Sequence, residues 1–197
     1  MINSRQLSLL RHGATEWALN GRHTGSTDLP LLPEGETEAR GLAPMLSQHS
    51  FPAVFSSPLQ RARRTCELCG MGDQVVVVET LQEWNYGDYE GVTMAEIQRD
   101  VPDWSIWTHG YPNGEDAAAV QQRCQRVIDR ALAVTEPGDV ALFAHGHLLR
   151  ALTGTWRDLG AQGGGLIKLS TGSICVLGHE HSQRAVSRWN APTSGDY

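Results

Sequence analysis

Ser8-Leu9-Leu10-Arg11-His12-Gly13 joins the end of an apolar run to an arginine, a histidine and a glycine. The apolar part, from about Gln6 to Leu10, predicts a buried strand, and α/β sheets commonly present reactive side chains at the carboxyl ends of such strands. An isolated Arg-His-Gly tripeptide is more often an ordinary turn than a catalytic motif. Its interpretation therefore depends on what the rest of the chain places beside it.

The composition of the 197-residue chain is typical of one globular domain, which we expect to span residues 1–197 with a flexible tail at 191–197. No apolar run approaches the roughly 18 residues needed for a membrane span. Residues 1–6 also lack the apolar region of a secretory signal, so we expect a cytoplasmic protein without membrane partners. The formal net charge of −6 argues against binding nucleic acid through a basic surface.

Arginines nevertheless gather near the candidate motifs of this acidic chain. A cleft that concentrates positive potential suits a small anionic ligand, and phosphate is the obvious candidate. Arg63 and Arg64 are expected on other faces of their helix and in contact with solvent. The arginines near the motifs are Arg11, Arg22, Arg61, Arg63 and Arg64.

Two further apolar strands are predicted to end in polar residues. Ala53-Val54-Phe55 runs into Ser56-Ser57-Pro58 and then into a helix whose first turn carries Arg61. Residues 140–144 run into His145-Gly146-His147. Because the carboxyl ends of parallel strands meet at one edge of a sheet, we expect these groups to lie near Arg11 and His12.

The valines at residues 75–78 predict a fourth strand, buried on both faces, and Glu83 follows it. Trp84, Tyr86 and Tyr89 surround Glu83 in the sequence. Desolvation by such rings would raise the proton affinity of a carboxyl group, as a general acid requires. The alternative is that the rings cover the core and the acidic residues face water.

The alternation of strands and helices predicts an α/β fold, a three-layer α/β/α sandwich with a mostly parallel central sheet. Residues 166–170, 173–178 and 185–189 predict strands separated by glycine-rich turns. We interpret them as an antiparallel edge of the sheet. An exposed edge strand there would allow two chains to pair as a homodimer.

The connection from Ala14 to Pro33 is long, and such loops in a compact domain are usually functional or disordered. Thr24 and Ser26 offer hydroxyl donors to an oxyanion, although an ordinary surface loop is the alternative. Cys66 and Cys69 form a C-x-x-C inside a predicted helix, without a second such pair. We therefore expect buried free thiols in place of half a zinc site or a redox pair.

Two arginines, two imidazoles and one protonatable carboxyl group suit phosphoryl transfer without a metal ion or cofactor. Guanidinium groups match the equatorial phosphoryl oxygens in geometry and charge. A neutral imidazole nitrogen can attack phosphorus to form a phosphohistidine. A carboxylic acid then protonates the leaving alkoxide and, as a carboxylate, activates water. His145, as a cation or a hydrogen-bond donor, would stabilise the equatorial oxygens.

These residues lie in segments that resemble the histidine phosphatase superfamily, in the branch shared with cofactor-dependent phosphoglycerate mutases. The resemblance implies that His12 is the nucleophile, that Glu83 is the proton donor, and that Arg11, Arg61 and His145 form the phosphate pocket. The matching segments are Leu10-Arg11-His12-Gly13 with Thr15, Ser56-Ser57-Pro58-Leu59 with Arg61-Ala62 and Thr65, Glu83 within residues 81–91, and Ala144-His145-Gly146 with Arg150.

The resemblance also places the substrate-binding residues, with one departure from the family pattern. Many members have an asparagine seven residues after the motif arginine, where this chain has Ala18; Asn20 is nearby but out of register. Selection of a second anionic group by histidines, including His109, is one interpretation, and a hydrogen-bonded wall is the other. The candidate substrate-binding residues are Arg22, His23, Thr24, Gly25 and His147.

Within the superfamily, residues 21–25, 83–91, 143–147 and 176–181 resemble bacterial acid phosphatases and sedoheptulose bisphosphatases. True mutases are typically longer because of added segments around the cleft. We therefore expect a metal-independent phosphatase that hydrolyses small phosphorylated metabolites and releases inorganic phosphate. A phosphoglycerate mutase and a non-catalytic module that binds phospholigands are the alternatives.

Overall fold

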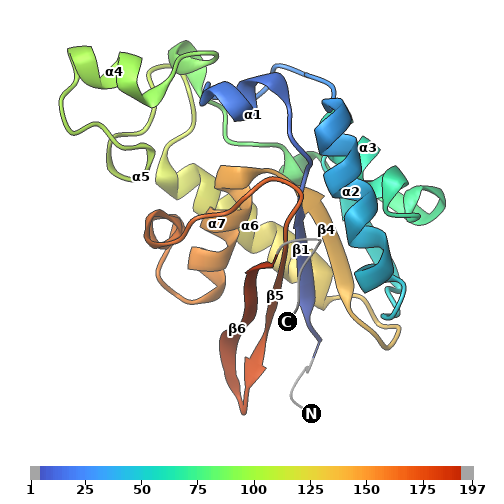
Figure 1. Ribbon diagram of the computed structural model, residues 1–197. Coiled ribbons are helices and arrows are strands. Elements are labelled where there is room, and N and C mark those ends of the chain that lie inside the picture. Colours follow the sequence, from blue (N-terminus) through green and yellow to red (C-terminus); the bar gives the residue numbers. More distant parts are fainter. Residues whose placement is uncertain (1–4, 192–197) are drawn as a thin grey trace.

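A single six-stranded sheet organises the computed structural model, which describes residues 5–191 (Figure 1). The strands are β1 (Leu7–Arg11), β2 (Ala53–Ser56), β3 (Val75–Val77), β4 (Val140–Ala144), β5 (Ile174–Glu180) and β6 (Gln183–Ala191). Their order is β3-β2-β4-β1-β5-β6. The first four strands in this order are parallel, and β5 and β6 are antiparallel. The predicted mostly parallel sheet with an antiparallel edge is confirmed.

Helices cover both faces of this sheet (Figure 1). They are α1 (Glu16–Asn20), α2 (Pro33–Leu46), α3 (Gln60–Leu68), α4 (Met94–Asp100), α5 (Ile106–His109), α6 (Ala117–Leu132) and α7 (Gly146–Trp156). Successive strand residues point to opposite faces, so the central strands contribute to two separate hydrophobic clusters. Leu9 and Leu142 pack with buried residues of α6 and α7, whereas Leu10 and Phe143 pack with those of α2 and α3.

The strand register brings three strand ends together at one edge of the sheet. Arg11 of β1 lies opposite Ala144 of β4, and Ser56 of β2 lies opposite Phe143 of β4. Because these strands are parallel, the chain leaves all three of them in the same direction. The residues that emerge side by side are His12, Ser57 and His145.

The predicted strand at residues 75–78 exists as β3, but the prediction that it is buried on both faces is wrong. β3 pairs with β2 and ends the sheet on that side. Val76 and Val77 are 44% and 43% exposed. β-Branched residues suit strand geometry in edge and central strands alike, so the valine run does not distinguish the two positions.

The predicted strand at residues 166–170 is also wrong. Ala161–Leu166 form a 3-10 helix, and the chain then continues without a strand until β5. A Cβ atom on Gly164 would lie 2.6 Å from the ring of Trp107, so the glycine-rich segment packs closely on its neighbours. The other two predicted strands lie largely within β5 and β6. Of the predicted tail at 191–197, Ala191 ends β6 and the other residues lie outside the described part of the chain.

Local capping explains where several helices begin. The connection from Ala14 to Pro33 contains α1, because Thr15 accepts a hydrogen bond from the N–H of Ala18 and caps the helix. The spacing of Thr93 and Glu96 predicts a capping box at the start of α4, and the structure confirms it, since the two residues exchange both of its hydrogen bonds. The sequence pattern also predicts helices at residues 33–48, 59–68, 115–134 and 148–159. They agree with α2, α3, α6 and α7 to within three residues at each end.

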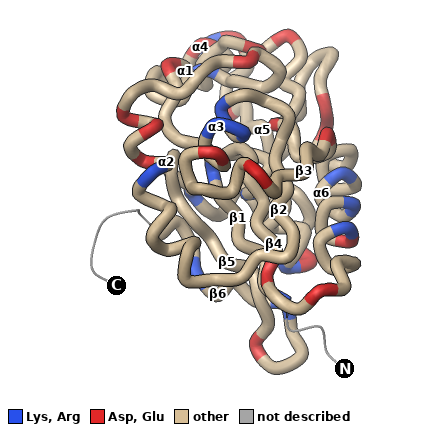
Figure 2. The backbone as a smooth tube through the Cα atoms, turned by 90° about the vertical axis from the view of Figure 1, so that its right-hand side faces the viewer, with Lys and Arg blue, Asp and Glu red and all other residues tan. Residues whose placement is uncertain are grey.

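Other expectations concern cysteines, charge and membranes. Cys66, Cys69, Cys124 and Cys175 are buried free thiols. In the view of Figure 2, acidic and basic residues are interspersed over the outer helices and loops. Between residues 5 and 191, no helix has the length and apolar character needed to cross a bilayer.

Candidate active site

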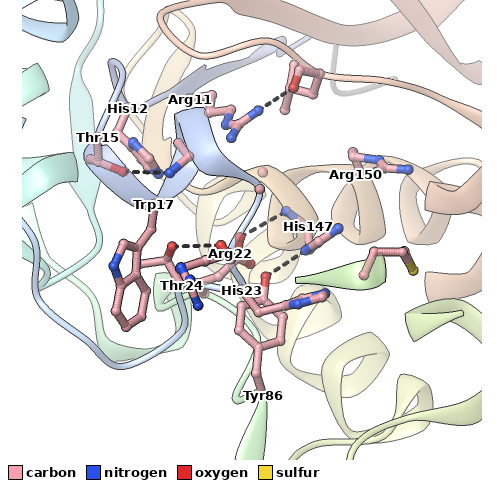
Figure 3. A pocket seen from close by; sticks show the side chains of 16 residues that line it. Arg11, His12, Thr15, Trp17, Arg22, His23, Thr24, Tyr86, His147 and Arg150 are labelled. Carbon is pink, nitrogen blue, oxygen red and sulfur yellow. Dashed lines mark hydrogen bonds between the residues drawn. The ribbon is translucent and has the colours of Figure 1, made fainter. Parts of the chain in front are cut away.

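A cavity of about 220 Å³ opens beside the carboxyl ends of β1 and β4 (Figure 3). Its lining carries more positive than negative side chains, which favours an anionic ligand. Figure 3 shows Arg11 and His12 near one another, with His147, His23 and Tyr86 across the cavity. The charged and imidazole residues in the lining are Arg11, Arg22, Arg150, His12, His23, His147 and Glu83.

His12 is buried and holds a defined tautomer. Its Nδ1 lies 2.8 Å from the carbonyl oxygen of Gly13. Because a carbonyl oxygen only accepts, Nδ1 carries the proton and Nε2 keeps its lone pair. Burial and the nearby guanidinium groups of Arg61 and Arg11 hold the pKa of His12 well below its usual value. His12 is therefore a neutral imidazole whose Nε2 is suited to nucleophilic attack.

Arg11 lines this cavity and has one buried donor without a partner in the described part of the chain. Its Nη1 donates to the carbonyl oxygen of Leu169, while its Nε is a buried donor with no hydrogen-bond partner among residues 5–191. A Cβ atom on Gly146 would lie 3.1 Å from Cζ of Arg11, so this glycine leaves room for the guanidinium group. An unpartnered buried donor beside His12 is suited to binding an anion.

Arg61 and His145 lie next to His12, but they are fully buried and do not line the cavity. The ring centroids of His12 and His145 are 5.2 Å apart. Arg61 Nε donates to Nδ1 of His145 at 3.1 Å, so the proton of His145 is on Nε2, which donates to Ser57 Oγ at 2.8 Å. Burial and the charge of Arg61 lower the pKa of His145 well below its usual value. His145 is thus neutral, and its N–H faces Ser57.

Arg61 also holds the loop at residues 24–27. Its Nη2 donates to the carbonyl oxygens of Thr24 and Gly25, both at 3.0 Å, and its Nη1 to that of Thr27 at 2.9 Å. From the other side, the Glu90 carboxylate accepts the N–H groups of Gly25 and Thr27 at 3.0 and 2.9 Å. Thr24 lines the cavity, whereas Gly25 lies behind it with its N–H already bonded.

Glu83 lines the cavity, and its carboxylate lies at the amino terminus of α7. Its carboxylate accepts the backbone N–H groups of Trp84 at 2.9 Å, His147 at 3.0 Å and Leu148 at 2.8 Å. The first turn of a helix has N–H groups without intrahelical partners, and the helix dipole favours negative charge there. The sequence indicates only the aromatic rings around Glu83. It does not reveal that three backbone N–H groups bind the carboxylate.

The far wall of the cavity consists of neutral polar rings. Nδ1 of His23 donates to the carbonyl oxygen of Val92 at 2.6 Å, and Nδ1 of His147 lies 2.6 Å from the hydroxyl of Tyr86. Burial lowers the pKa of both histidines. Arg22 is exposed at the mouth and donates to the carbonyl oxygen of Gly91 at 2.6 Å.

Several lining residues are absent from the sequence-based set of site residues, and some residues considered there lie elsewhere. Arg150 lines the cavity; it is three residues from His147 on α7, so helical spacing alone could have placed both on one face. His109 is exposed and does not line the cavity; Asn20 does not either, whereas Ala18 does. The lining residues not predicted include Trp17, Tyr86, Met94 and Leu169.

The grouping of side chains also bears on metals. Within the described part of the chain, no three or more His, Cys, Asp or Glu residues are grouped as a metal site would require.

Known proteins with similar sequences and structures share this architecture. The family model "Histidine phosphatase superfamily (branch 1)" matches residues 7–192. The chain is 37% identical to an acid phosphatase of Mycobacterium tuberculosis, over 94% of this chain and 92% of that protein. It is 35% identical to a sedoheptulose 1,7-bisphosphatase of Saccharomyces cerevisiae, over 78% and 68% of the two chains. The solved structure of an open reading frame of Mycobacterium tuberculosis, 36% identical, matches with a TM-score of 0.92 over 96% and 99% of the chains.

Proposed function

Because this chain belongs to the histidine phosphatase superfamily and is a phosphatase, we propose that it hydrolyses small phosphomonoesters through a phosphohistidine on Nε2 of His12, without a metal ion. One observation carries this proposal: the neutral His12, whose tautomer leaves the lone pair on Nε2, lines the same cavity as Arg11, whose guanidinium group has a buried donor unpartnered within residues 5–191. A cavity of about 220 Å³ is smaller than the roughly 300–1,000 Å³ typical of drug-sized ligands, which supports a small metabolite as the substrate.

In the first step, Nε2 of His12 attacks phosphorus, a P–N bond forms and the P–O bond to the leaving group breaks. Arg11 donates to the phosphoryl oxygens, and its charge offsets the negative charge that they carry. In the substrate complex the carboxyl group of Glu83 carries one proton, as a general acid requires. Glu83 then gives that proton to the leaving oxygen, so the alcohol departs neutral.

In the second step, Glu83 acts as a carboxylate and takes a proton from water. The oxygen of that water attacks phosphorus, the P–N bond breaks and His12 recovers its lone pair. Inorganic phosphate leaves with the oxygen that came from water. At the end of this step His12 again has its Nε2 lone pair, and Glu83 holds the proton from water. Release of that proton to solvent, after phosphate has left, returns Glu83 to the carboxylate that accepts three backbone N–H groups in the structure.

The remaining predicted site residues have supporting positions. We assign Arg61 and His145 to the layer directly behind the phosphate pocket. There Arg61 lowers the pKa of His12 and holds the loop at 24–27, and His145 positions Ser57. The part of the substrate beyond its phosphate contacts the cavity wall. Within this proposal the substrate-binding residues are Arg22, His23, Thr24 and His147, and Gly25 shapes the loop that carries Thr24.

Hydrolysis of p-nitrophenyl phosphate in excess chelator tests the proposal. The wild-type chain should be active and should form a phosphoenzyme that is labile to acid and stable to base, and H12N should lose both properties. H181N is the matched control, because His181 is 91% exposed and has a φ of 54°, a conformation that asparagine tolerates. Full activity in H12N would exclude the covalent step, and loss of activity with chelator would exclude metal independence.

A mutase would give a different product. With 3-phosphoglycerate as substrate, we expect release of inorganic phosphate. Isomerisation without phosphate release would favour the mutase alternative instead.

A further inference from the structure

Glu83 lies on a segment that belongs to no regular helix or strand. The chain leaves β3 at Val77, forms a short 3-10 helix at Glu79–Leu81 and then runs irregularly to Gly87. Peptide groups in such a segment have no ladder of their own, so other residues must satisfy them. The position of the Glu83 carboxylate therefore depends on what binds the backbone of residues 80–85.

Arg123 of α6 binds three carbonyl groups of this segment. Its Nη1 donates to the carbonyl oxygens of Thr80 at 3.0 Å and Gln82 at 2.5 Å, and its Nη2 to that of Glu83 at 3.3 Å. Its Nε and Nη2 also bind the carboxylate of Glu115, at 3.0 and 2.7 Å. These contacts use all five N–H groups of a guanidinium group that is almost entirely buried.

Glu115 binds the other side of the same segment. Its carboxylate accepts the N–H of Asn85 at 2.9 Å, and its own N–H donates to the carbonyl oxygen of Asn85 at 3.0 Å. Its carbonyl oxygen accepts the indole N–H of Trp84 at 2.9 Å. Arg123 of α6 and Glu115, which directly precedes the N-cap of this helix, together form the α6 clamp.

We propose that the α6 clamp positions Glu83 for proton transfer, with Arg123 as the positioning residue. The backbone of Glu83 is held from α6 by Arg123, while its carboxylate is held from α7 by the N–H groups of His147 and Leu148. α6 and α7 lie side by side on one face of the sheet (Figure 1). Arg123 does not line the cavity that contains His12, so it acts on the reaction through Glu83. This inference rests on the proposed function, in which Glu83 transfers the proton.

The contacts of Arg123 require the shape of a guanidinium group. Its planar fork binds a carboxylate on one side and carbonyl oxygens on the other. A lysine would keep the positive charge that faces Glu115, but its three N–H groups cannot replace five donors spread over two sides. R123K should therefore loosen the segment that carries Glu83 without leaving Glu115 unpaired.

Two phosphomonoesters that differ in their need for a proton test the proposal. The leaving group of an alkyl ester such as glycerol phosphate is an alkoxide, which needs protonation. The leaving group of 2,4-dinitrophenyl phosphate is a phenolate, which is stable without a proton. A displacement of about 1 Å can reduce a rate about 100-fold, so we expect R123K to lower kcat/KM for the alkyl ester by about 10- to 100-fold. For the dinitrophenyl ester the loss should stay below about threefold, because no proton is needed there.

R126K is the matched control, because Arg126 is an exposed arginine of the same helix and has no place in the site. It should leave kcat/KM for both esters unchanged. An equal loss on both esters in R123K would indicate a general structural role and would overturn the proposal.

A double-mutant comparison separates this inference from the proposed function. If Arg123 acts through Glu83, R123K should lower kcat/KM for the alkyl ester in the wild-type background but have no further effect in E83Q. A full additional loss in E83Q would overturn the role of Arg123. If E83Q itself retains wild-type activity on the alkyl ester, the proposed proton transfer fails whatever R123K does.

E115Q provides a second variant should R123K fold poorly. It leaves Arg123 in place but replaces one carboxylate acceptor of the clamp with an N–H donor that faces the N–H groups of Asn85 and Arg123. We expect the same preference, with a larger loss for the alkyl ester than for the dinitrophenyl ester. Equal losses on the two esters would again overturn the proposal.

Discussion

Arg61 donates its Nε–H to Nδ1 of His145 across 3.1 Å, and this contact determines which nitrogen of His145 carries the proton. Since an arginine N–H can only donate, the proton of His145 is on Nε2 and points at Ser57. The same guanidinium group contributes to the lowered pKa of His12. Arg61 therefore selects the tautomer of His145 and helps to keep His12 neutral, in addition to holding the loop at residues 24–27.

Removing the charge of Arg61 should raise the pKa of His12. In the wild-type chain, burial is the main cause of the lowered pKa and the charge of Arg61 is the next, so R61Q removes a positive charge that favours the neutral ring. NMR titration of the His12 ring nitrogens should show its protonation at a higher pH in R61Q. The acid limb of the pH profile of kcat/KM should move in the same direction. An unchanged titration of His12 would contradict the electrostatic role of Arg61.

The buried histidines should make the protein less stable in acid. The pKa values of His12, His145 and His147 are lowered in the folded state, whereas the unfolded chain takes up protons near the ordinary histidine pKa of about 6.5. The unfolded state therefore binds more protons below that pH, and the free energy of unfolding falls as the pH decreases.

Urea unfolding at pH 7, 6 and 5 measures this effect. Well below pH 6.5, each such histidine contributes about 1.4 kcal/mol per pH unit to the slope, so H12N should have a shallower slope than the wild type by about that amount. H181N is the control, and its slope should match the wild type. A free energy of unfolding that stays constant or rises toward pH 5 would contradict the prediction.

Two glycines near the site should differ in their tolerance of alanine. A Cβ atom on Gly13 would lie 2.0 Å from the carbonyl oxygen of Gly35, so backbone would have to move, and we expect G13A to destabilise the protein by more than about 3 kcal/mol. Gly21 has a φ of 75° with open space around its Cα, so G21A should cost only about 1–2 kcal/mol through backbone strain. Chemical denaturation of both variants measures the difference, and equal losses would contradict it.

Glu90 should affect substrate binding through the loop at residues 24–27. E90Q keeps the size of the side chain but offers one oxygen in place of two to the N–H groups of Gly25 and Thr27, so the loop should loosen. Because Thr24 lines the cavity, we expect KM to rise by roughly three- to tenfold, as one weakened hydrogen bond implies.

Steady-state kinetics with p-nitrophenyl phosphate and hydrogen exchange at Gly25 and Thr27 measure this change. E34Q, which alters an exposed glutamate in the first turn of α2, is the control for the change in charge. An unchanged KM together with faster exchange at these two amides would separate loop order from substrate binding and contradict the prediction.

Much of the fold and the approximate place of the site could be predicted because they depend on local patterns. Apolar runs that end in His12 and His145 mark strands whose carboxyl ends carry polar residues, and parallel pairing brings such ends to one edge. The capping box of Thr93 and Glu96 likewise depends on residues three apart. The position of β3 could not be predicted in this way, because edge and central strands share a preference for valine.

In the amino-acid sequence alone, the resemblance of several short motifs indicates the family, the alternation of strands and helices predicts the mostly parallel sheet, and the residues that follow the apolar runs predict the charged groups at its edge. Only the tertiary structure decided which partner each of these groups has. His145 donates to Ser57, Arg61 binds the carbonyl groups of residues 24–27, and Arg123 holds the backbone that carries Glu83. These contacts join residues far apart in the chain, and hydrogen-bond direction and burial depend on the packed geometry that brings such residues together.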